Sequence, residues 1–260
     1  MIGLEQLLNY YPPLVRDNPS FHKYILKEYI QLIILEYLTT TPWIRKVTFI
    51  GGTYLRLAKG IDRFSEDIDF DCKAFSREEF DEMTDHILKF LIRSGWVVEI
   101  RDKPSKKMTA FRRSYYFPGL LFNLGLSGYR EERFLIKIEA EDQQIDYNRT
   151  MGKISGCGLF FLFPVPTDPV VCSMKLSALL TRQKGRDFYD ILFLMGQTRP
   201  DFGFMEARTG IPDLAGLKSA LAGLLNETDL HRKSRDFKHL LFNPDNNHRI
   251  LEFGEFVKGL

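Results

Sequence analysis

Apolar positions along the chain follow two different periods, and the change between them falls near residue 165. Over residues 1–45 they recur at helical spacing, as Ile33, Ile34 and Tyr37 illustrate, until a Thr-Thr-Thr-Pro segment ends the helix at residue 42. A capping box at Ser76 and Glu79 predicts a second helix that runs to residues 94–95. Short apolar or alternating runs predict strands at 47–50, 68–71, 96–101, 109–117, 133–139 and 158–163.

Beyond Asp168 the pattern is largely helical, and three prolines within residues 164–169 mark the change. Helices are expected at 168–183, 186–196, 213–226, 229–241 and 247–258. We therefore predict an α+β fold in two parts. Residues 1–165 form N-terminal helices and a mixed sheet flanked by helices, and residues 166–260 form a C-terminal helical lobe.

Composition refines this picture only slightly. The net charge of +2 gives no overall field that would recruit nucleic acid, so a nucleic-acid site would be a local patch. The three cysteines form no CxxC pair and are expected to be buried thiols in a reducing cytoplasm. The longest apolar run is too short to span a bilayer, and residues 1–11 lack the basic start of a signal peptide. We expect a cytoplasmic protein with no membrane partner.

A glycine turn is the first candidate for chemistry. Gly51 and Gly52 follow the strand at 47–50 and let the backbone approach a ligand closely. The helix that follows, with Thr53 as its predicted N-cap, offers free N–H groups to a phosphate. The alternative interpretation is a tight strand-to-helix turn that binds nothing.

A pair of carboxylates follows the turn. Asp67 and Asp69 lie two residues apart in a strand, so both side chains leave the same face and repel each other unless a cation lies between them. Carboxylate oxygens suit Mg²⁺ or Mn²⁺. Glu139 is the best candidate for a third ligand, with Glu141 one step further on the same face. The alternatives are solvated acids on an exposed strand and, for Glu139, a surface pair with Lys137.

The glycine turn, as a phosphate site, and the carboxylate pair, as a metal site, together predict nucleotidyl transfer. In that reaction one metal bridges the triphosphate and a second activates the attacking hydroxyl.

A second set of charged residues lies on two consecutive helices. Lys175 and Arg182 share one helix face, and Asp187 and Asp190 share a face of the next helix. The set either forms a structural ion-pair network or lets Lys175 offset negative charge on the leaving pyrophosphate.

These two sets together resemble the AbiEii/AbiGii toxin family of nucleotidyltransferases, within the DNA polymerase β-like superfamily. The resemblance starts in Lys27-Glu28-Tyr29 and continues through Gly-Gly-Thr-x-Leu-Arg-Leu, which begins at Gly51. It includes Arg-x-Ser-Glu-Asp-Ile-Asp-Phe from Arg63, and Lys-Leu-x-Ala-Leu to Arg-Asp-Phe-Tyr-Asp over residues 175–190. It spans about residues 24–195. Many members of the superfamily carry Ser where this chain has Thr53, and the hydroxyl is kept.

The resemblance implies a polymerase β-like nucleotidyltransferase fold that uses Mg²⁺ or Mn²⁺ and an NTP. Asp67 and Asp69 would bind the catalytic metal, and Lys175 and Asp190 would act with them in catalysis, with Asp190 shaping the site between the lobes. The nucleotide-binding residues that it implies are Gly51, Gly52, Thr53, Arg63, Ser65, Lys175, Arg182, Arg186 and Asp187.

The same resemblance implies a toxin of a toxin–antitoxin or phage-defence pair, whose partner is an antitoxin. Some members of the family transfer nucleotides to tRNA 3′ ends, which makes tRNA a candidate acceptor, and others bind GTP. Basic residues around a predicted hairpin, with aromatic residues between them, could follow an RNA backbone; they are Lys103, Lys106, Lys107, Arg112 and Arg113. A solvated hairpin is the alternative there. Two other functions stay open: a non-catalytic nucleotide-binding or interaction module, and a nucleotidyltransferase acting on a protein or small-molecule hydroxyl.

Overall fold

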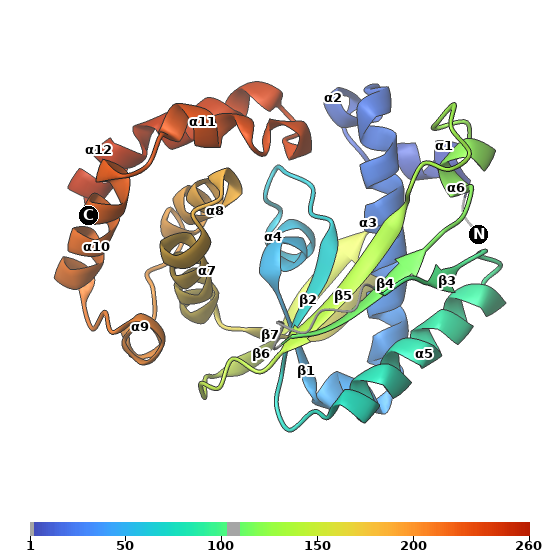
Figure 1. Ribbon diagram of the computed structural model, residues 1–260, viewed down its shortest axis with the longest axis horizontal. Coiled ribbons are helices and arrows are strands. Elements are labelled where there is room, and N and C mark those ends of the chain that lie inside the picture. The colour runs from blue at the N-terminus through green and yellow to red at the C-terminus, as the bar shows by residue number, and fades with distance from the viewer. Residues whose placement is uncertain (1–2, 103–109) are drawn as a thin grey trace. The chain divides into compact units, whose positions relative to one another are not determined.

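The chain forms two compact units in a computed structural model that describes residues 3–102 and 110–260 (Figure 1). Unit 1 contains Met1–Gly60, Phe64–Gln144 and Met151–Val165. Unit 2 contains the rest, namely Ile61–Arg63, Ile145–Thr150 and Pro166–Leu260. The predicted boundary between residues 165 and 166 stays a prediction.

Unit 1 is built on a mixed sheet with the strand order β1-β2-β5-β4-β3. β2 and β5 are parallel, and the other neighbours are antiparallel. A separate sheet pairs β6 with β7. The mixed sheet and its flanking helices confirm the predicted fold class. The strands are β1 (Val47–Ile50), β2 (Asp67–Cys72), β3 (Glu99–Ile100), β4 (Phe111–Tyr116), β5 (Leu135–Glu141), β6 (Arg149–Gly156) and β7 (Leu159–Pro166).

Strand alternation gives the main sheet one apolar face and one charged face. Ile68, Phe70 and Ile138 are buried on the apolar face, where Phe163 of β7 stacks on Phe70 with ring centroids 5.9 Å apart. Residues of the opposite parity, which include Asp69, therefore leave the other face. The apolar contacts anchor the sheet and leave the carboxylates on the side away from the core.

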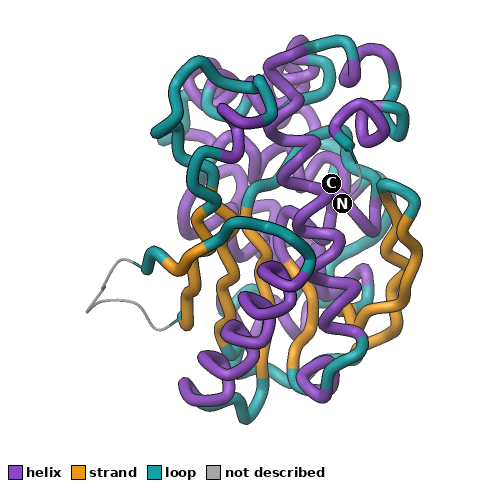
Figure 2. Tube along the Cα trace, turned by 90° about the vertical axis from the view of Figure 1, so that its right-hand side faces the viewer, coloured by secondary structure: helices purple, strands orange, loops and turns teal. Residues whose placement is uncertain are grey.

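Helices cover unit 1, and α3 and α5 pack against its sheet (Figure 2). The predicted capping box of α5 is confirmed: Ser76 Oγ accepts the Glu79 N–H at 3.2 Å, and Glu79 Oε2 accepts the Ser76 N–H at 3.0 Å. The helices of the unit are α1 (Leu4–Leu8), α2 (Pro13–Arg16), α3 (Pro19–Thr39), η1 (Pro42–Arg45), α4 (Gly51–Lys59), α5 (Arg77–Arg93) and α6 (Leu120–Asn123).

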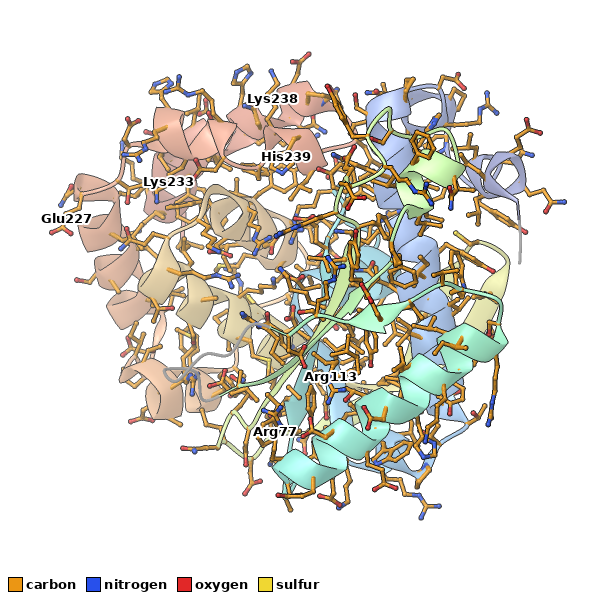
Figure 3. The ribbon with its side chains drawn as sticks, turned by 45° about the vertical axis from the view of Figure 1, so that its right-hand side comes forward. Arg77, Arg113, Glu227, Lys233, Lys238 and His239 are labelled. Atoms are coloured by element: carbon orange, nitrogen blue, oxygen red, sulfur yellow. The ribbon has the colours of Figure 1, made fainter. Side chains whose placement is uncertain are left out.

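Arg113 joins β4 to α5 and does not lie on an exposed basic surface (Figure 3). Its guanidinium is buried and donates to Asp85 and Asp81 of α5, both at 2.7 Å. Arg113 therefore fits neither alternative for this segment, an RNA-binding patch or a solvated hairpin, because it is buried and α5 carboxylates neutralise its charge. The lysines of that predicted patch, Lys103, Lys106 and Lys107, lie outside the described residues.

Unit 2 is helical, as the apolar pattern beyond Asp168 predicts. Phe188 and Phe253 meet edge to face in its core, with ring centroids 5.0 Å apart. The short Ile61–Arg63 segment joins this unit through a bridge between Arg63 and Leu241. The helices are α7 (Asp168–Arg182), α8 (Gly185–Met195), α9 (Phe202–Thr209), α10 (Leu214–Asn226), α11 (Leu230–Arg235), η2 (Lys238–Leu240), η3 (Pro244–Glu252) and α12 (Phe253–Lys258).

Several boundaries differ from the sequence predictions. β6 was not predicted, because it has glycines and several exposed positions and therefore shows no apolar run. α9 was also not predicted. The helix expected at 229–241 is α11 followed by the short 3-10 turn η2, and the one expected at 247–258 begins as the 3-10 helix η3. The periods of a 3-10 helix and an α-helix differ little over a short segment. Apolar spacing along the sequence therefore does not distinguish the two.

Two bulk predictions can be compared with the structure. Cys72, Cys157 and Cys172 are buried free thiols, as expected. Burial raises the pKa of each thiol, to about 12 for Cys72 and Cys172 and to about 11 for Cys157. Within residues 3–102 and 110–260, no helix is long and apolar enough to cross a membrane.

Candidate active site

The glycine turn brings the start of α4 directly against Asp69. Gly51 is the first residue of α4 and has a φ of +82°, a conformation that favours glycine. A Cβ atom added at Gly51 would lie 2.8 Å from both Cβ and Cγ of Asp69, closer than such atoms approach. Only glycine therefore satisfies both the backbone angle and the space, and the first turn of α4 lies beside a carboxylate of β2.

Thr53 has a different role from the predicted one. The N-cap of α4 is Ile50, because the positive φ of Gly51 lets the helix begin before Thr53 is reached. Thr53 is fully buried, and its hydroxyl donates to the backbone carbonyl of Asp67. The N-cap prediction is therefore wrong. Thr53 joins α4 to β2 at the start of the acid-x-acid strand, and its contact with a nucleotide stays a prediction.

The three predicted metal ligands lie on one face of two adjacent strands. Asp69 of β2 is the register partner of Glu139 on β5, and Asp67 is the partner of Lys137. Residues paired in this way project to the same side of the sheet, so Asp67, Asp69 and Glu139 share the charged face. All three carboxylates are half-buried. In ligand type they suit a hard divalent cation.

Basic side chains hold two of these carboxylates in ion pairs. Lys137 Nζ lies 3.5 Å from Asp67 Oδ1, and Arg112 Nη2 lies 2.6 Å from Glu139 Oε1. Glu139 therefore pairs with Arg112 on β4, whereas the sequence suggested Lys137. Within the part of the chain that the structure describes, no group of three or more His, Cys, Asp or Glu residues is close enough to hold a metal ion. Two of the three carboxylates, Asp67 and Glu139, therefore have a cation as their partner.

Arg112 and Lys137 lie at this site, although the sequence analysis placed Arg112 in the basic hairpin patch and named Lys137 only as an alternative partner of Glu139. A signal existed for Lys137, because strict alternation over residues 135–139 places it on the same face as Glu139. Arg112 had no comparable signal. Its contact with Glu139 depends on the register between β4 and β5, which no local pattern determines.

We expect Gly51→Ala to lower the free energy of unfolding by about 2 kcal/mol or more, because it adds a clash to an unfavourable φ. Gly60→Ala is the matched control: Gly60 also has a positive φ, of +74°, but an added Cβ would meet nothing within 4 Å. Its cost should be about 1 kcal/mol. Chemical denaturation of the two variants measures the difference. Equal losses would contradict the close approach of Gly51 to Asp69.

Unit 2 contains a buried network around Asp190. Arg63 Nε donates to Asp190 Oδ1 at 2.7 Å and Nη2 to Oδ2 at 2.8 Å, and Lys175 Nζ donates to Oδ2 at 2.9 Å. The side chains of Arg63 and Asp190 are 1% and 0% exposed. Burial alone would raise the pKa of Asp190, but the charges of Arg63 and Lys175 lower it to about 2. The network links the Ile61–Arg63 segment to α7 and α8.

A second pair lies at the start of α8. Arg182 donates to both oxygens of Asp187, from Nε at 3.0 Å and from Nη2 at 2.7 Å, and the backbone N–H of Lys184 donates to the same carboxylate at 3.1 Å. Asp187 is fully buried. Its carboxylate both caps the start of α8 and pairs with Arg182 of α7. Arg186 is half-buried and makes no ion pair with another described residue.

The predicted residues therefore fall into two groups. Those in unit 1 are Gly51, Gly52, Thr53, Ser65, Asp67, Asp69 and Glu139, and those in unit 2 are Arg63, Lys175, Arg182, Arg186, Asp187 and Asp190. Ser65 is buried before β2, where its carbonyl accepts a hydrogen bond from Gln31 of α3 at 3.3 Å. Arg63 and Ser65, which are close in the sequence, belong to different units.

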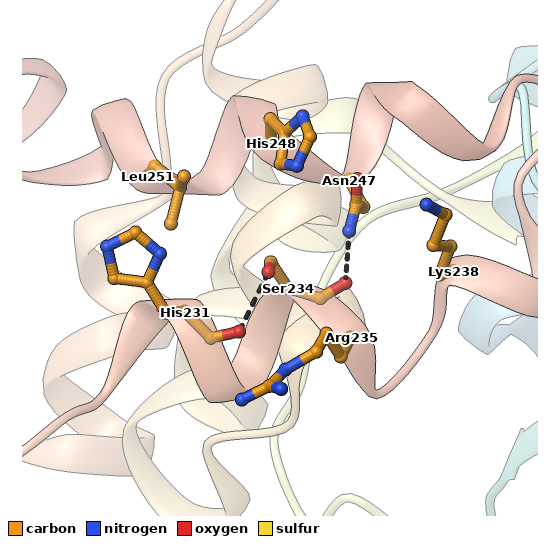
Figure 4. A pocket seen from close by; sticks show the side chains of 7 residues that line it. All are labelled: His231, Ser234, Arg235, Lys238, Asn247, His248 and Leu251. Carbon is orange, nitrogen blue, oxygen red and sulfur yellow. Dashed lines mark hydrogen bonds between the residues drawn. The ribbon is translucent and has the colours of Figure 1, made fainter.

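Unit 2 also contains a pocket of about 610 Å³ between α11, η2 and η3 (Figure 4). Asn247 is buried beside it and donates to the carbonyl of Ser234 at 3.0 Å. The lining residues are His231, Ser234, Arg235, Lys238, Asn247, His248 and Leu251. The lining includes the cations Arg235 and Lys238 and none of the predicted site residues.

A glycine turn against an acid-x-acid strand of a mixed sheet is typical of nucleotidyltransferases. A family model described as the nucleotidyl transferase AbiEii toxin of a Type IV toxin–antitoxin system matches residues 33–238. That match covers more than half of the chain, so the protein belongs to the AbiEii nucleotidyltransferase toxin family. The resemblance inferred from the motifs is thereby confirmed.

Solved structures share this fold. The M. tuberculosis protein MenT4, described as a nucleotidyltransferase toxin, aligns with a TM-score of 0.63 over 100% of this chain and 91% of its own, at 14% identity. A putative nucleotidyltransferase from H. pylori aligns with a TM-score of 0.56 and 20% identity, over 90% of this chain and 92% of its own. JHP933 from H. pylori reaches 0.54 and 19% identity, over 90% of each chain. At these identities the likeness shows the fold alone. No curated protein matches this chain by sequence.

Proposed function

We propose that this chain transfers a nucleoside monophosphate from an NTP to an acceptor hydroxyl with the help of Mg²⁺ or Mn²⁺. One observation carries the proposal. The first turn of α4 lies against Asp69, on a sheet face that also bears Asp67 and Glu139. N–H groups at a helix start favour phosphate, and carboxylates on one face favour a divalent cation. The transfer of a nucleotide needs both groups side by side.

In this proposal the glycines of unit 1 bind phosphate and the carboxylates of unit 1 bind the metal. Gly51 and Gly52 keep the backbone free of side chains, so that the phosphates can reach the N–H groups of α4. Asp67, Asp69 and Glu139 would hold the metal, which when bound neutralises triphosphate charge and favours ionisation of the attacking hydroxyl.

For unit 2 we propose that Lys175 contacts the nucleotide and that Asp190 and Arg63 position it. The Lys175 ammonium has three donors, and its contact with Asp190 uses one of them. Burial lowers the pKa of Lys175, and the Asp190 charge opposes that shift and so favours the ammonium form. We assign Ser65, Arg182, Arg186 and Asp187 to the nucleotide-binding set in the same way, as the family motifs imply.

We further propose an RNA acceptor, such as a tRNA 3′ end. Arg235 and Lys238 line the unit 2 pocket and offer two positive charges to a polyanionic acceptor, and Lys238 also lies 4.0 Å from Asp245. Because the family belongs to Type IV toxin–antitoxin systems, we also propose an antitoxin partner and a cytoplasmic site of action.

The test is a labelling experiment. The purified chain is incubated with each α-labelled NTP and total RNA, in Mg²⁺ and in excess EDTA. We expect label on RNA from at least one NTP, loss of label in EDTA, and recovery when Mn²⁺ is added. Label on protein or on small molecules alone would overturn the RNA acceptor. If no acceptor is labelled while calorimetry shows metal-independent NTP binding, the chain is a nucleotide-binding module.

A further inference from the structure

Two cations occupy the face of the sheet on which the metal ligands lie. Arg112 on β4 is the register partner of Glu139, and Lys137 on β5 is the register partner of Asp67. Each cation therefore stands directly opposite the carboxylate that it contacts, at 2.6 Å for Arg112 and 3.5 Å for Lys137. The arrangement follows from the strand register and is not a chance contact of long side chains.

Both ion pairs are partly open to solvent. The exposed fractions of the side chains are 39% and 24% for Arg112 and Glu139, and 39% and 31% for Lys137 and Asp67. The Arg112 Nε is buried and has no hydrogen-bond partner among the described residues, so the guanidinium is not fully satisfied by Glu139. Solvent-screened pairs of this kind are weak, and a doubly charged ion is able to replace them.

We propose that Arg112 and Lys137 compete with the divalent metal for Glu139 and Asp67. A bound NTP removes this competition, because its phosphate oxygens pair with the two side chains that the carboxylates release. The inference rests on the proposed function, because it needs the metal site on this face. It assigns Arg112 and Lys137 as residues that couple metal binding to nucleotide binding.

The coupling arises because metal and NTP affect the two cations, Arg112 and Lys137, in opposite ways. Metal alone must break two ion pairs, and it leaves Arg112 and Lys137 without counterions beside a new positive charge. An NTP that arrives with the metal supplies phosphate oxygens to both cations. Metal and NTP therefore strengthen each other's binding, by the same factor in each direction. Metal without nucleotide is therefore expected to bind weakly to this face of the sheet.

The experiment measures Mn²⁺ affinity by electron paramagnetic resonance, with and without an NTP analogue whose α,β bridge cannot be cleaved. The variants are Lys137→Met and Arg112→Met. We expect each to bind Mn²⁺ alone about three- to ten-fold more tightly than the wild type, because an ion pair and a positive charge have been removed. We also expect the analogue to increase Mn²⁺ affinity less in each variant than in the wild type.

Arg101→Met is the matched control, since Arg101 pairs with Glu99 at an exposed position and contacts none of the three ligands. Its Mn²⁺ affinity should equal that of the wild type. Lys137→Gln repeats the test with a polar side chain, and an unchanged denaturation midpoint shows that each variant is folded.

Two outcomes would count against the inference in different ways. If the wild type binds Mn²⁺ and neither variant binds it more tightly, the competition is absent and the proposed function stands. If the wild type binds no Mn²⁺ even with the analogue, the proposed metal site fails and this inference fails with it.

Discussion

Asp69→Asn should lower the rate of nucleotidyl transfer by about a thousandfold or more while the fold persists. Asp69 is the carboxylate that lies beside the first turn of α4, so it is the ligand closest to the proposed phosphate site. Loss of a metal ligand there removes several kcal/mol of transition-state stabilisation. Asparagine has the shape of aspartate and fits against Gly51. It also removes repulsion from Asp67, so stability should hold or rise slightly.

The measurements are single-turnover transfer rates and urea denaturation of the same preparations. Glu141→Gln is the matched control, because it removes the same charge from the same face of the sheet, next to Asp71 in register and away from α4. Its rate should remain within a factor of about three, since Glu141 is not one of the three proposed metal ligands and solvent screens its charge. Full activity in Asp69→Asn would show that the site assignment is wrong.

The second large effect concerns stability. Asp190→Leu should lower the free energy of unfolding by about 3–5 kcal/mol, because it leaves the buried charges of Arg63 and Lys175 without a counterion. The triple variant Arg63→Met, Lys175→Met, Asp190→Leu should recover most of that loss, since the volume is filled without buried charge. Urea denaturation measures all three proteins. An unchanged stability in Asp190→Leu would contradict the buried network.

Lys238→Met is the control for this series. Lys238 approaches Asp245 only at 4.0 Å, with both side chains largely exposed, so its loss should cost less than ~0.5 kcal/mol. A comparable loss in Lys238→Met would show that any cation in unit 2 matters equally, and would remove the special role of Asp190.

The Asp190 network also sets a pH dependence. Folding lowers the pKa of Asp190 from its ordinary 3.8 to about 2, so the unfolded chain binds a proton more readily than the folded one. The stabilisation is complete above pH 3.8 and is lost as the pH falls toward 2, by on the order of 2 kcal/mol. The triple variant should lack this part of the acid dependence, and denaturation midpoints between pH 4.5 and pH 2.5 would show the difference.

Local patterns predicted well wherever a single element decides the outcome. The alternation around Asp67 and Asp69 placed both carboxylates on one face, and Ser76 with Glu79 marked the start of α5, because these depend on strand pleating and helix capping alone. Predictions failed where the conformation of a segment depends on an adjacent residue or on another strand. The start of α4 depends on the positive φ of Gly51, and β6 exists because β7 pairs with it.

The amino-acid order by itself determined the mixed sheet, the helical C-terminal half, the family motifs and the set of carboxylates, because periodicity and glycine turns are local properties. Only the tertiary structure decided which charge meets which. Arg112 reaches Glu139 through the β4–β5 register, and Arg63 reaches Asp190 across 127 positions of the sequence. An ion pair between two distant segments forms only when folding brings the segments together, and no local pattern in the sequence shows which segments meet.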